Sequence, residues 1–155
     1  MSIRPVTAAF RLITILMTLG FIIGKAAGLK TLQFTVGSAS HNVGVVFAYW
    51  LDMLPQGFCI AALWEATNVF DRLSRGEAFN KAVVKGLRGI GLNLILSALA
   101  AVVIVPSLKP TFLGQGWVVN LNVDLQSVTI GLIGIVLYAV ARQGTALKAE
   151  LESFV

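Results

Sequence analysis

Hydrophobic residues fall into four long runs along the chain, separated by shorter polar segments. About 20 consecutive apolar residues are enough to carry a helix across the hydrocarbon core of a bilayer. The pattern therefore predicts an all-α membrane protein, a bundle of four transmembrane helices over residues 8–24, 43–70, 87–105 and 126–141.

The four runs differ in length. The first and last are short, and Arg11 and Lys25 in the first can extend their charged ends toward the two interfaces. The second is longer than a span requires, so it must tilt, kink or protrude, and Pro55 is the expected kink site. The third is expected to stop at Pro106.

Two loops between the runs show a different pattern. Apolar and polar residues alternate in Thr31–Val36 and again in Trp117–Gln126, which is typical of strands. Because isolated strands are marginally stable, we expect the two segments to pair in a small sheet over the outer helix ends. The alternative is a pair of unrelated extended loops.

The overall composition agrees with a membrane protein. Of 155 residues, 57% are hydrophobic and 12% are charged, whereas soluble domains have about 25% charged residues. The net charge of +5 would suggest nucleic-acid binding in a soluble protein. Here the excess of positive charge on cytoplasmic loops explains it, so no nucleic-acid partner is expected.

The positions of Lys and Arg predict the orientation. Nine lie in the N-terminal segment, the central loop and the tail, and three lie in the other two loops (Lys25, Lys30 and Lys109). The positive-inside rule then places both termini and the central loop in the cytoplasm. The first apolar run is expected to remain as a helix, since no signal-peptide cleavage pattern follows it.

The central segment 71–88 holds five of the basic residues. The second helix is expected to continue through Arg75 and to end at Gly76, which suits a left-handed terminator. Phe79 would pack back as an anchor, and Asn80 would cap the third helix. This segment is either a contact surface for a cytoplasmic protein or an anchor to lipid phosphates, through Arg72, Arg75, Glu77, Phe79, Lys81, Lys85 and Arg88.

The same residues carry a resemblance. The sequence of Phe70–Asn80 is FDRLSRGEAFN, that of Leu87–Gly91 is LRGIG, and that of Ala141–Glu150 is ARQGTALKAE. These segments resemble the central hairpin and the ending of the DUF2975 family, with Asn80 in place of the more usual Ser or Thr. The resemblance implies a small four-span bacterial membrane protein in the inner membrane. It also implies a cytoplasmic protein partner, because some relatives are paired with small helix-turn-helix regulators.

Polar residues inside the second and third runs are candidate sites. Glu65, with Asn68 and Asn93 as neighbours, is a candidate proton or cation site, because an intramembrane carboxylate must be protonated, paired or hydrated. Alternatively, Glu65 pairs with Arg72, Lys85 or Arg88. Asp52 is expected to pair with Lys25 or Lys30 near the outer interface.

The sequence gives no indication of catalysis, cofactor binding or metal binding. It contains no nucleophile–base pair, phosphate loop or paired catalytic acids, so we expect neither an enzyme nor a cofactor. His41 has no second ligand at metal spacing, and Cys59 lies in an apolar run as a small packing residue.

The remaining features favour a binding role. Small-residue spacings at Gly20, Gly24 and Gly28, and at Gly131 and Gly134, permit close helix approach within the chain, to another protein or to a second copy. The tail 142–155 is expected to form a short amphipathic helix. We therefore expect a membrane protein that binds other proteins, as an accessory subunit or an anchor for a cytoplasmic regulator. The alternative is a small oligomeric transporter or proton-coupled channel that uses Glu65.

Overall fold

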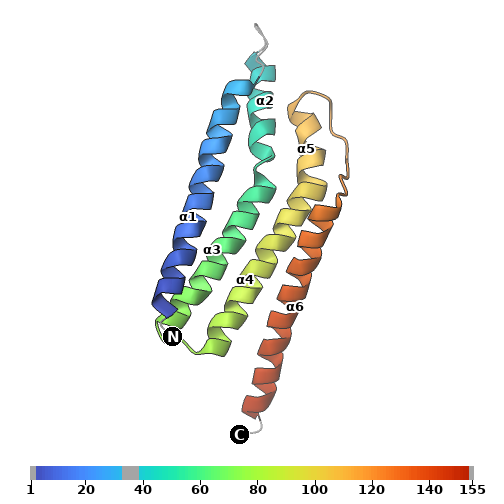
Figure 1. Cartoon of the computed structure of the whole chain (residues 1–155). Helices are drawn as coiled ribbons and strands as arrows, with labels where there is room; N and C mark the ends of the chain where they lie inside the picture. Colours follow the sequence, from blue (N-terminus) through green and yellow to red (C-terminus); the bar gives the residue numbers. More distant parts are fainter. Residues whose placement is uncertain (1–2, 33–38, 154–155) are drawn as a thin grey trace.

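The computed structural model describes residues 3–32 and 39–153, and these residues are almost entirely helical (Figure 1). A short 3-10 helix, η1 (Leu29–Thr31), follows the first long helix, and a π-helical segment, η2 (Ala100–Ile104), joins two others. The α-helices are α1 (Ile3–Gly28), α2 (Ala39–Leu51), α3 (Leu54–Ser74), α4 (Phe79–Leu99), α5 (Val105–Phe112) and α6 (Leu125–Ser153).

Four segments of the described chain are long and apolar enough to cross a membrane, as predicted. They are Thr7–Gly28, His41–Ser74, Lys81–Phe112 and Leu125–Gly144. The second has 34 residues and the third has 32. Both are much longer than the roughly 20 residues that a helix needs to cross a bilayer. Their excess length lies in α2 and α5, which pack against each other at one end of the molecule (Figure 1).

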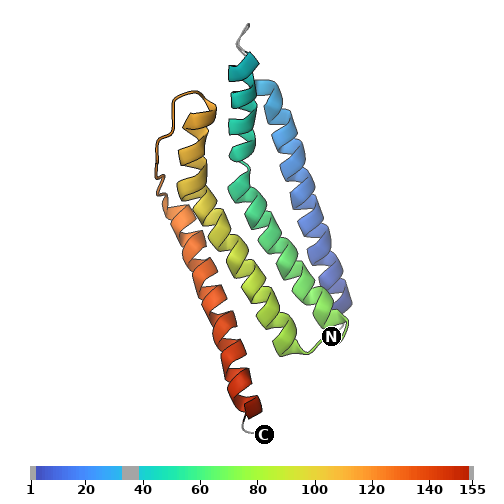
Figure 2. The ribbon, with the colours of Figure 1, turned by 180° about the vertical axis from the view of Figure 1, so that it is seen from behind.

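The four long helices lie side by side in a row, in the order α1, α3, α4, α6 (Figures 1 and 2). We call this arrangement the helix row. The most extensive contacts join α4 to α6 and α3 to α4, while α1 packs on α3. The start of α1, the turn between α3 and α4 and the end of α6 lie at the same end of the molecule (Figure 1). The assignment of that end to the cytoplasm stays a prediction from the charges.

Small residues fill the space between the helices. Ala82 and Ala100 are fully buried, and the hydroxyl oxygens of Thr14 in α1 and Thr67 in α3 lie 3.1 Å apart in a buried contact. Large apolar side chains such as Leu12 of α1 are instead exposed. This distribution is typical of membrane helices, which approach closely through small residues and turn large ones toward lipid.

The predicted kink at Pro55 takes the form of a break. α2 ends at Leu51 and α3 begins at Leu54, so that Pro55 lies in the first turn of the new helix. The missing N–H of proline is harmless in a first turn, because helix bonding has not yet begun there.

The expected stop at Pro106 is wrong. The helical path continues from α4 through η2 into α5 as far as Phe112, with Pro106 in the first turn of α5. Proline leaves the carbonyl four residues earlier, that of Val102, without its usual donor. The backbone N–H of Asn122 donates to this oxygen at 3.0 Å. A loop residue thus satisfies the carbonyl, and the chain stays helical.

The loop after α5 only partly follows its prediction. Leu125 and Gln126 belong to α6, so the strand expected over 117–126 does not form there. Residues 117–124 run without regular secondary structure, and no strand occurs in ranges 3–32 and 39–153. The proposed pairing partner, Thr31–Val36, lies mostly outside the described residues, so the sheet stays a prediction.

α6 is longer than the fourth predicted span. It continues without interruption from Leu125 to Ser153, so residues 142–153 extend the membrane helix rather than forming a separate one. α1 also extends beyond its predicted bounds at both ends.

Candidate functional site

The turn between α3 and α4 is held by a specific set of backbone hydrogen bonds. The N–H of Glu77 donates to the carbonyl of Arg72 at 3.1 Å, and the N–H of Gly76 donates to that of Leu73 at 3.1 Å. Gly76 has a φ of +82°. These two bonds and the left-handed glycine make a Schellman motif, as the sequence predicted for Gly76. The turn therefore has one defined geometry.

The start of α4 differs from the prediction. The N-cap residue is Ala78, and α4 begins at Phe79, so the prediction that Asn80 caps the helix is wrong. Ala78 has extended backbone angles, and its carbonyl already accepts the N–H of Ala82 at 3.1 Å. The helix can begin there without a side-chain cap. The prediction that Phe79 packs back as an anchor stays a prediction, because its side chain is outside those that the structure describes.

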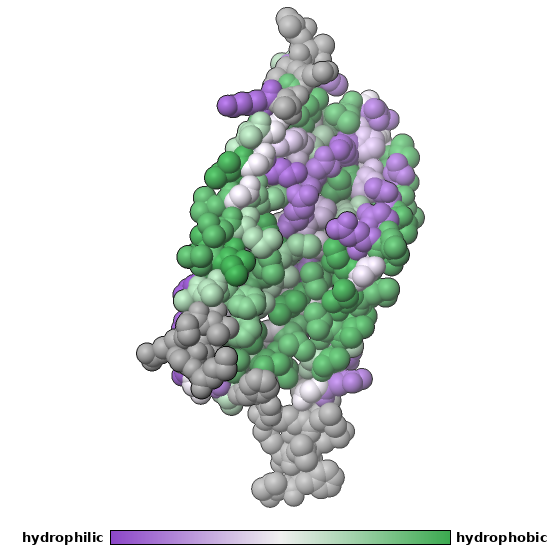
Figure 3. All heavy atoms as spheres, viewed as in Figure 1, coloured by the Kyte–Doolittle hydropathy of each residue, from purple (hydrophilic) through white to green (hydrophobic). Residues whose placement is uncertain are grey.

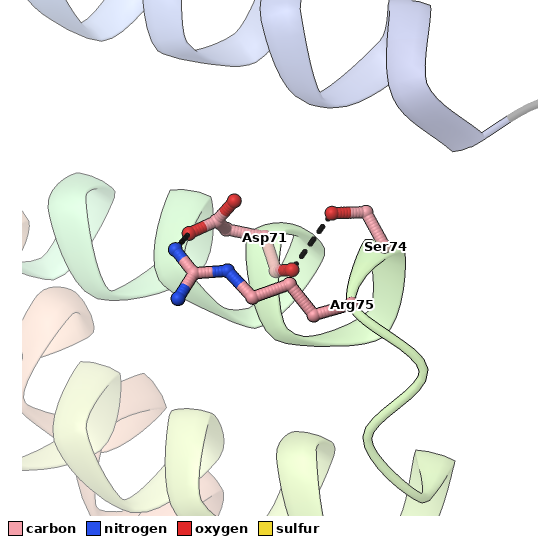
Figure 4. A network of polar contacts seen from close by, with 3 residues as sticks. All are labelled: Asp71, Ser74 and Arg75. Carbon is pink, nitrogen blue, oxygen red and sulfur yellow. Dashed lines mark hydrogen bonds and ion pairs between the residues drawn. The ribbon is translucent and has the colours of Figure 1, made fainter.

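Charged side chains surround this turn. The guanidinium of Arg75 forms an ion pair with the carboxylate of Asp71, one turn earlier on α3 (Figure 4). The hydroxyl of Ser74 donates to the backbone carbonyl of Asp71 at 2.7 Å (Figure 4). The side chain of Arg75 is 74% exposed, so the pair is solvated and contributes at most about 1 kcal/mol.

α4 presents its basic residues away from α3. Lys81, Lys85 and Arg88 are exposed, while Ala82 and Gly86 between them are buried. The Arg88 guanidinium lies over the ring of Tyr138 in α6, 5.9 Å from its centre. This arrangement gives a basic surface along the first turns of α4, continuous with the turn. We call Arg75, Lys81, Lys85 and Arg88 the basic hairpin surface.

Arg72 differs from the other basic residues of the segment. Its Nη1 atom is buried and has no hydrogen-bond partner in the described part of the chain. A buried donor without a partner costs about 1–3 kcal/mol, and more when it is charged. Arg72 lies two helical turns from Glu65, so both residues occupy one face of α3.

The structure brings together two of the three polar residues that the sequence singled out within the second and third apolar runs. The Glu65 carboxylate lies against Gly89 of α4, where a β-carbon would be 3.3 Å from Oε2. The Asn93 amide donates to the Gly89 carbonyl at 3.0 Å. Glu65 and Asn93 thus meet at one glycine. The Asn68 side chain makes no hydrogen bond within the described residues.

Glu65 forms no salt bridge with any of the three predicted partners, whose side chains are all among those that the structure describes. The predicted pairing with Arg72, Lys85 or Arg88 therefore does not form.

At the opposite end, Asp52 pairs with a residue that the sequence did not indicate. The Lys109 ammonium lies 2.6 Å from the Asp52 carboxylate, so the predicted pairing with Lys25 or Lys30 is wrong. Lys25 instead lies over the Phe21 and Tyr49 rings, 5.9 Å and 5.8 Å from their centres. No group of three His, Cys, Asp or Glu residues able to hold a metal occurs among the residues that the structure places.

The sequence interpretation also missed the cap of α6. The backbone N–H of Ser127 donates to Asp124 Oδ1 at 2.6 Å, and its hydroxyl donates to Oδ2 at 2.9 Å. These bonds lower the pKa of the Asp124 carboxyl below its usual value, the backbone bond most strongly. An aspartate just before an apolar run is a helix-start signal, but the alternating pattern assigned Asp124 to a strand.

Comparison with known proteins gives a match at the level of a family. No curated protein and no solved structure matches the chain. The model of one family, described as a protein of unknown function, DUF2975, matches residues 5–155. This match covers all four spans and the α3–α4 turn. The chain therefore belongs to the DUF2975 family.

Proposed function

We propose that this chain is a non-enzymatic membrane protein of the bacterial cytoplasmic membrane that acts by binding other proteins. Both termini and the α3–α4 turn face the cytoplasm in this proposal, because most of the Lys and Arg residues lie in those segments. The chain serves either as an accessory subunit of a membrane assembly or as an anchor for a cytoplasmic regulator.

The observation that carries the proposal is the fixed shape of the α3–α4 turn beneath exposed charges. The Schellman motif at Gly76 fixes how the chain leaves α3, and the packing of α3 on α4 sets their relative geometry. The basic hairpin surface is exposed around it. Charges on a rigid support bind an acidic partner with less loss of conformational entropy than charges on a mobile loop.

Arg72 adds a second argument. Its buried Nη1 has no partner in the described structure, which is costly for stability. Residues that lower stability are expected at functional sites, where they are retained for binding. A partner that binds at the turn and draws the Arg72 side chain outward would satisfy this donor with an acidic group.

The test is site-specific photocrosslinking in the native membrane. A photoreactive amino acid at Ala78, which is exposed in the turn, should give a defined crosslinked protein identifiable by mass spectrometry. The same residue at Lys30, near the opposite end, is the matched control. Changing Lys81 and Lys85 together to Gln should remove the crosslink, and Lys30→Gln should not. A chain that always purifies alone would overturn the proposal.

Removal of basic residues can invert a membrane protein, because they set its orientation. Each variant therefore needs a C-terminal reporter that distinguishes cytoplasmic from external location. Loss of the crosslink counts only where the reporter remains on the wild-type side.

Glu65 supports a second candidate function, a small oligomeric transporter or proton-coupled channel. Its carboxylate lies between α3 and α4 against Gly89, without an ionic partner in the described residues. A carboxylate in this position can bind and release a proton or cation.

Flux into liposomes tests this alternative. Purified chain should carry protons or monovalent cations, and Glu65→Gln should abolish the flux because glutamine does not ionise. Glu77→Gln, at the turn, is the matched control and should leave it unchanged. Unchanged flux in Glu65→Gln would remove Glu65 from the mechanism, and no flux in the wild type would exclude transport of the ions tested.

A further inference from the structure

A groove lies on one face of the helix row, in the half of the molecule that includes Pro55. α1 borders it through Met17 and Phe21, and α6 borders it through Gln126 and Ile130, while α3 and α4 form its floor. Its volume is about 420 Å³, and most of its walls are apolar. Ligand pockets have volumes of about 300–1,000 Å³, so this groove is large enough for a ligand.

Three polar groups in the groove already have partners within the protein. The hydroxyl of Ser97 donates to the carbonyl of Pro55 at 2.7 Å, and the sulfur of Cys59 lies 3.2 Å from the same hydroxyl. The hydroxyl of Ser127, on the α6 border, donates to Asp124. These three groups therefore need no polar occupant. Gln56 and Gln126 supply polar groups at the end of the groove nearest to α2 and α5.

The groove follows α3 from Pro55 to Leu63, about 12 Å along the helix, with mostly apolar side chains along it. A flexible hydrocarbon chain fits the same space along its length, and the exposed apolar side chains of α1 beside it, such as Leu16, indicate that lipid reaches this face.

The polar end of the groove lies beside a charged pair. Asp52 is three residues before Pro55, within about one helical turn, and its carboxylate is paired with Lys109. The two side chains are 37% and 42% exposed, so both are accessible. On the face shown in Figure 3, hydrophilic side chains gather toward the end that carries α2 and α5, beside a broad apolar surface.

We propose that this groove binds one acyl chain of a phospholipid whose phosphoethanolamine head group lies at Asp52 and Lys109. The Lys109 ammonium donates to the phosphate, and the Asp52 carboxylate accepts from the ethanolamine ammonium. The pair presents one charge of each sign, which complements this zwitterionic head group. Asp52 lies about 20 residues, or roughly 30 Å, from Arg72 at the other end of α3, which places it at the opposite bilayer interface.

Lipid retention by the full chain tests the proposal. The purified protein is reconstituted in bilayers of equal phosphatidylethanolamine and phosphatidylglycerol, returned to mild detergent, and examined by native mass spectrometry. We expect the protein to retain about threefold more phosphatidylethanolamine than phosphatidylglycerol. An effect of this size is expected for a partly exposed charge contact.

Two sets of variants separate the acyl chain from the head group. Ala101→Phe places a large side chain on the groove wall and should remove retention of both lipids. Asp52→Asn with Lys109→Gln should abolish the preference while leaving some lipid bound. The controls are Ala139→Phe on the exposed side of α6 and Lys30→Gln at an exposed lysine outside the pair. Both should behave as wild type.

Three outcomes would overturn the proposal or one of its parts. Equal retention of the two lipids by the wild type would overturn the head-group assignment. Retention that Ala101→Phe leaves unchanged, with a wild-type unfolding temperature, would overturn the groove assignment. A bound second copy of the chain that Ala101→Phe displaces would also overturn it, because the groove would then be a protein interface.

Discussion

Gly91 of α4 and Gly134 of α6 lie against each other with their backbones in contact. A β-carbon on Gly91 would stand 2.7 Å from the carbonyl oxygen of Gly134, and one on Gly134 would stand 2.8 Å from that of Gly91. These obstacles are backbone atoms, which cannot rotate away as a side chain can. The closest approach of the two most extensively packed helices therefore depends on both residues being glycine.

Gly91→Ala or Gly134→Ala should lower the stability of the protein. The added methyl group must push α4 and α6 apart, and overpacking of this kind costs about 1–3 kcal/mol. Thermal unfolding in detergent, followed by circular dichroism, measures the effect. Gly20→Ala is the control, since nothing lies within 4 Å of a β-carbon there. Equal unfolding temperatures for all three variants would contradict the close α4–α6 contact.

Gly76→Ala should destabilise the α3–α4 turn. Gly76 has a φ of +82°, and an alanine in that conformation costs about 1–2 kcal/mol because its β-carbon approaches the following carbonyl. The control is Gly57→Ala within α3, where the site is open and φ is not positive. Urea titration of the purified protein should show a lower midpoint for Gly76→Ala alone. A midpoint equal to that of Gly57→Ala would show that the turn tolerates another geometry.

Features that depend on neighbouring residues in sequence were predicted well. The four apolar runs became four helices suited to a membrane, because length and hydropathy alone set this property. The left-handed stop at Gly76 was also predictable, since only glycine takes this conformation without strain. The N-cap was misplaced by two residues, at Asn80 instead of Ala78. Helix starts often shift because the bonds of the first turn have several alternatives.

Features that depend on which helices become neighbours were not predictable. Asp52 pairs with Lys109, and Gly91 contacts Gly134, both across long stretches of chain. Pro106 also failed as a stop signal. The carbonyl of Val102 accepts a hydrogen bond from the backbone N–H of Asn122, a loop residue 20 positions later. In the hydrocarbon core no water can bond a free carbonyl, so a helix continues past a proline only where the protein supplies another donor. A single sequence does not indicate where that donor comes from.

Arg72→Met should raise the stability of the protein. The change removes a buried Nη1 that has no partner in the described structure and retains a long apolar side chain. The cost of an unsatisfied donor suggests a gain of about 1–3 kcal/mol. Arg75→Met is the matched control, because it removes an equal charge from an exposed ion pair and should change stability by less than about 1 kcal/mol.

Unfolding in urea compares the two variants directly. A lower stability for Arg72→Met than for Arg75→Met would show that the guanidinium is satisfied by lipid or water in the membrane protein. In the photocrosslinking experiment, Arg72→Met should weaken the crosslink from Ala78 even though the protein is more stable. That combination distinguishes a binding residue from a structural one.

Asp124 should make the start of α6 sensitive to acid. Its hydrogen bonds to Ser127 lower the pKa of the folded carboxyl below the ordinary value of about 3.9. A lowered folded-state pKa means that the stabilisation is complete above the ordinary value and is lost as the pH falls through the lowered one. Asp124→Asn keeps a capping side chain but cannot titrate. Between about pH 5 and about pH 3, the unfolding temperature of the wild type should therefore fall further than that of Asp124→Asn. All other carboxylates are common to the two proteins, so parallel pH profiles would mean that Asp124 does not cap α6 in solution.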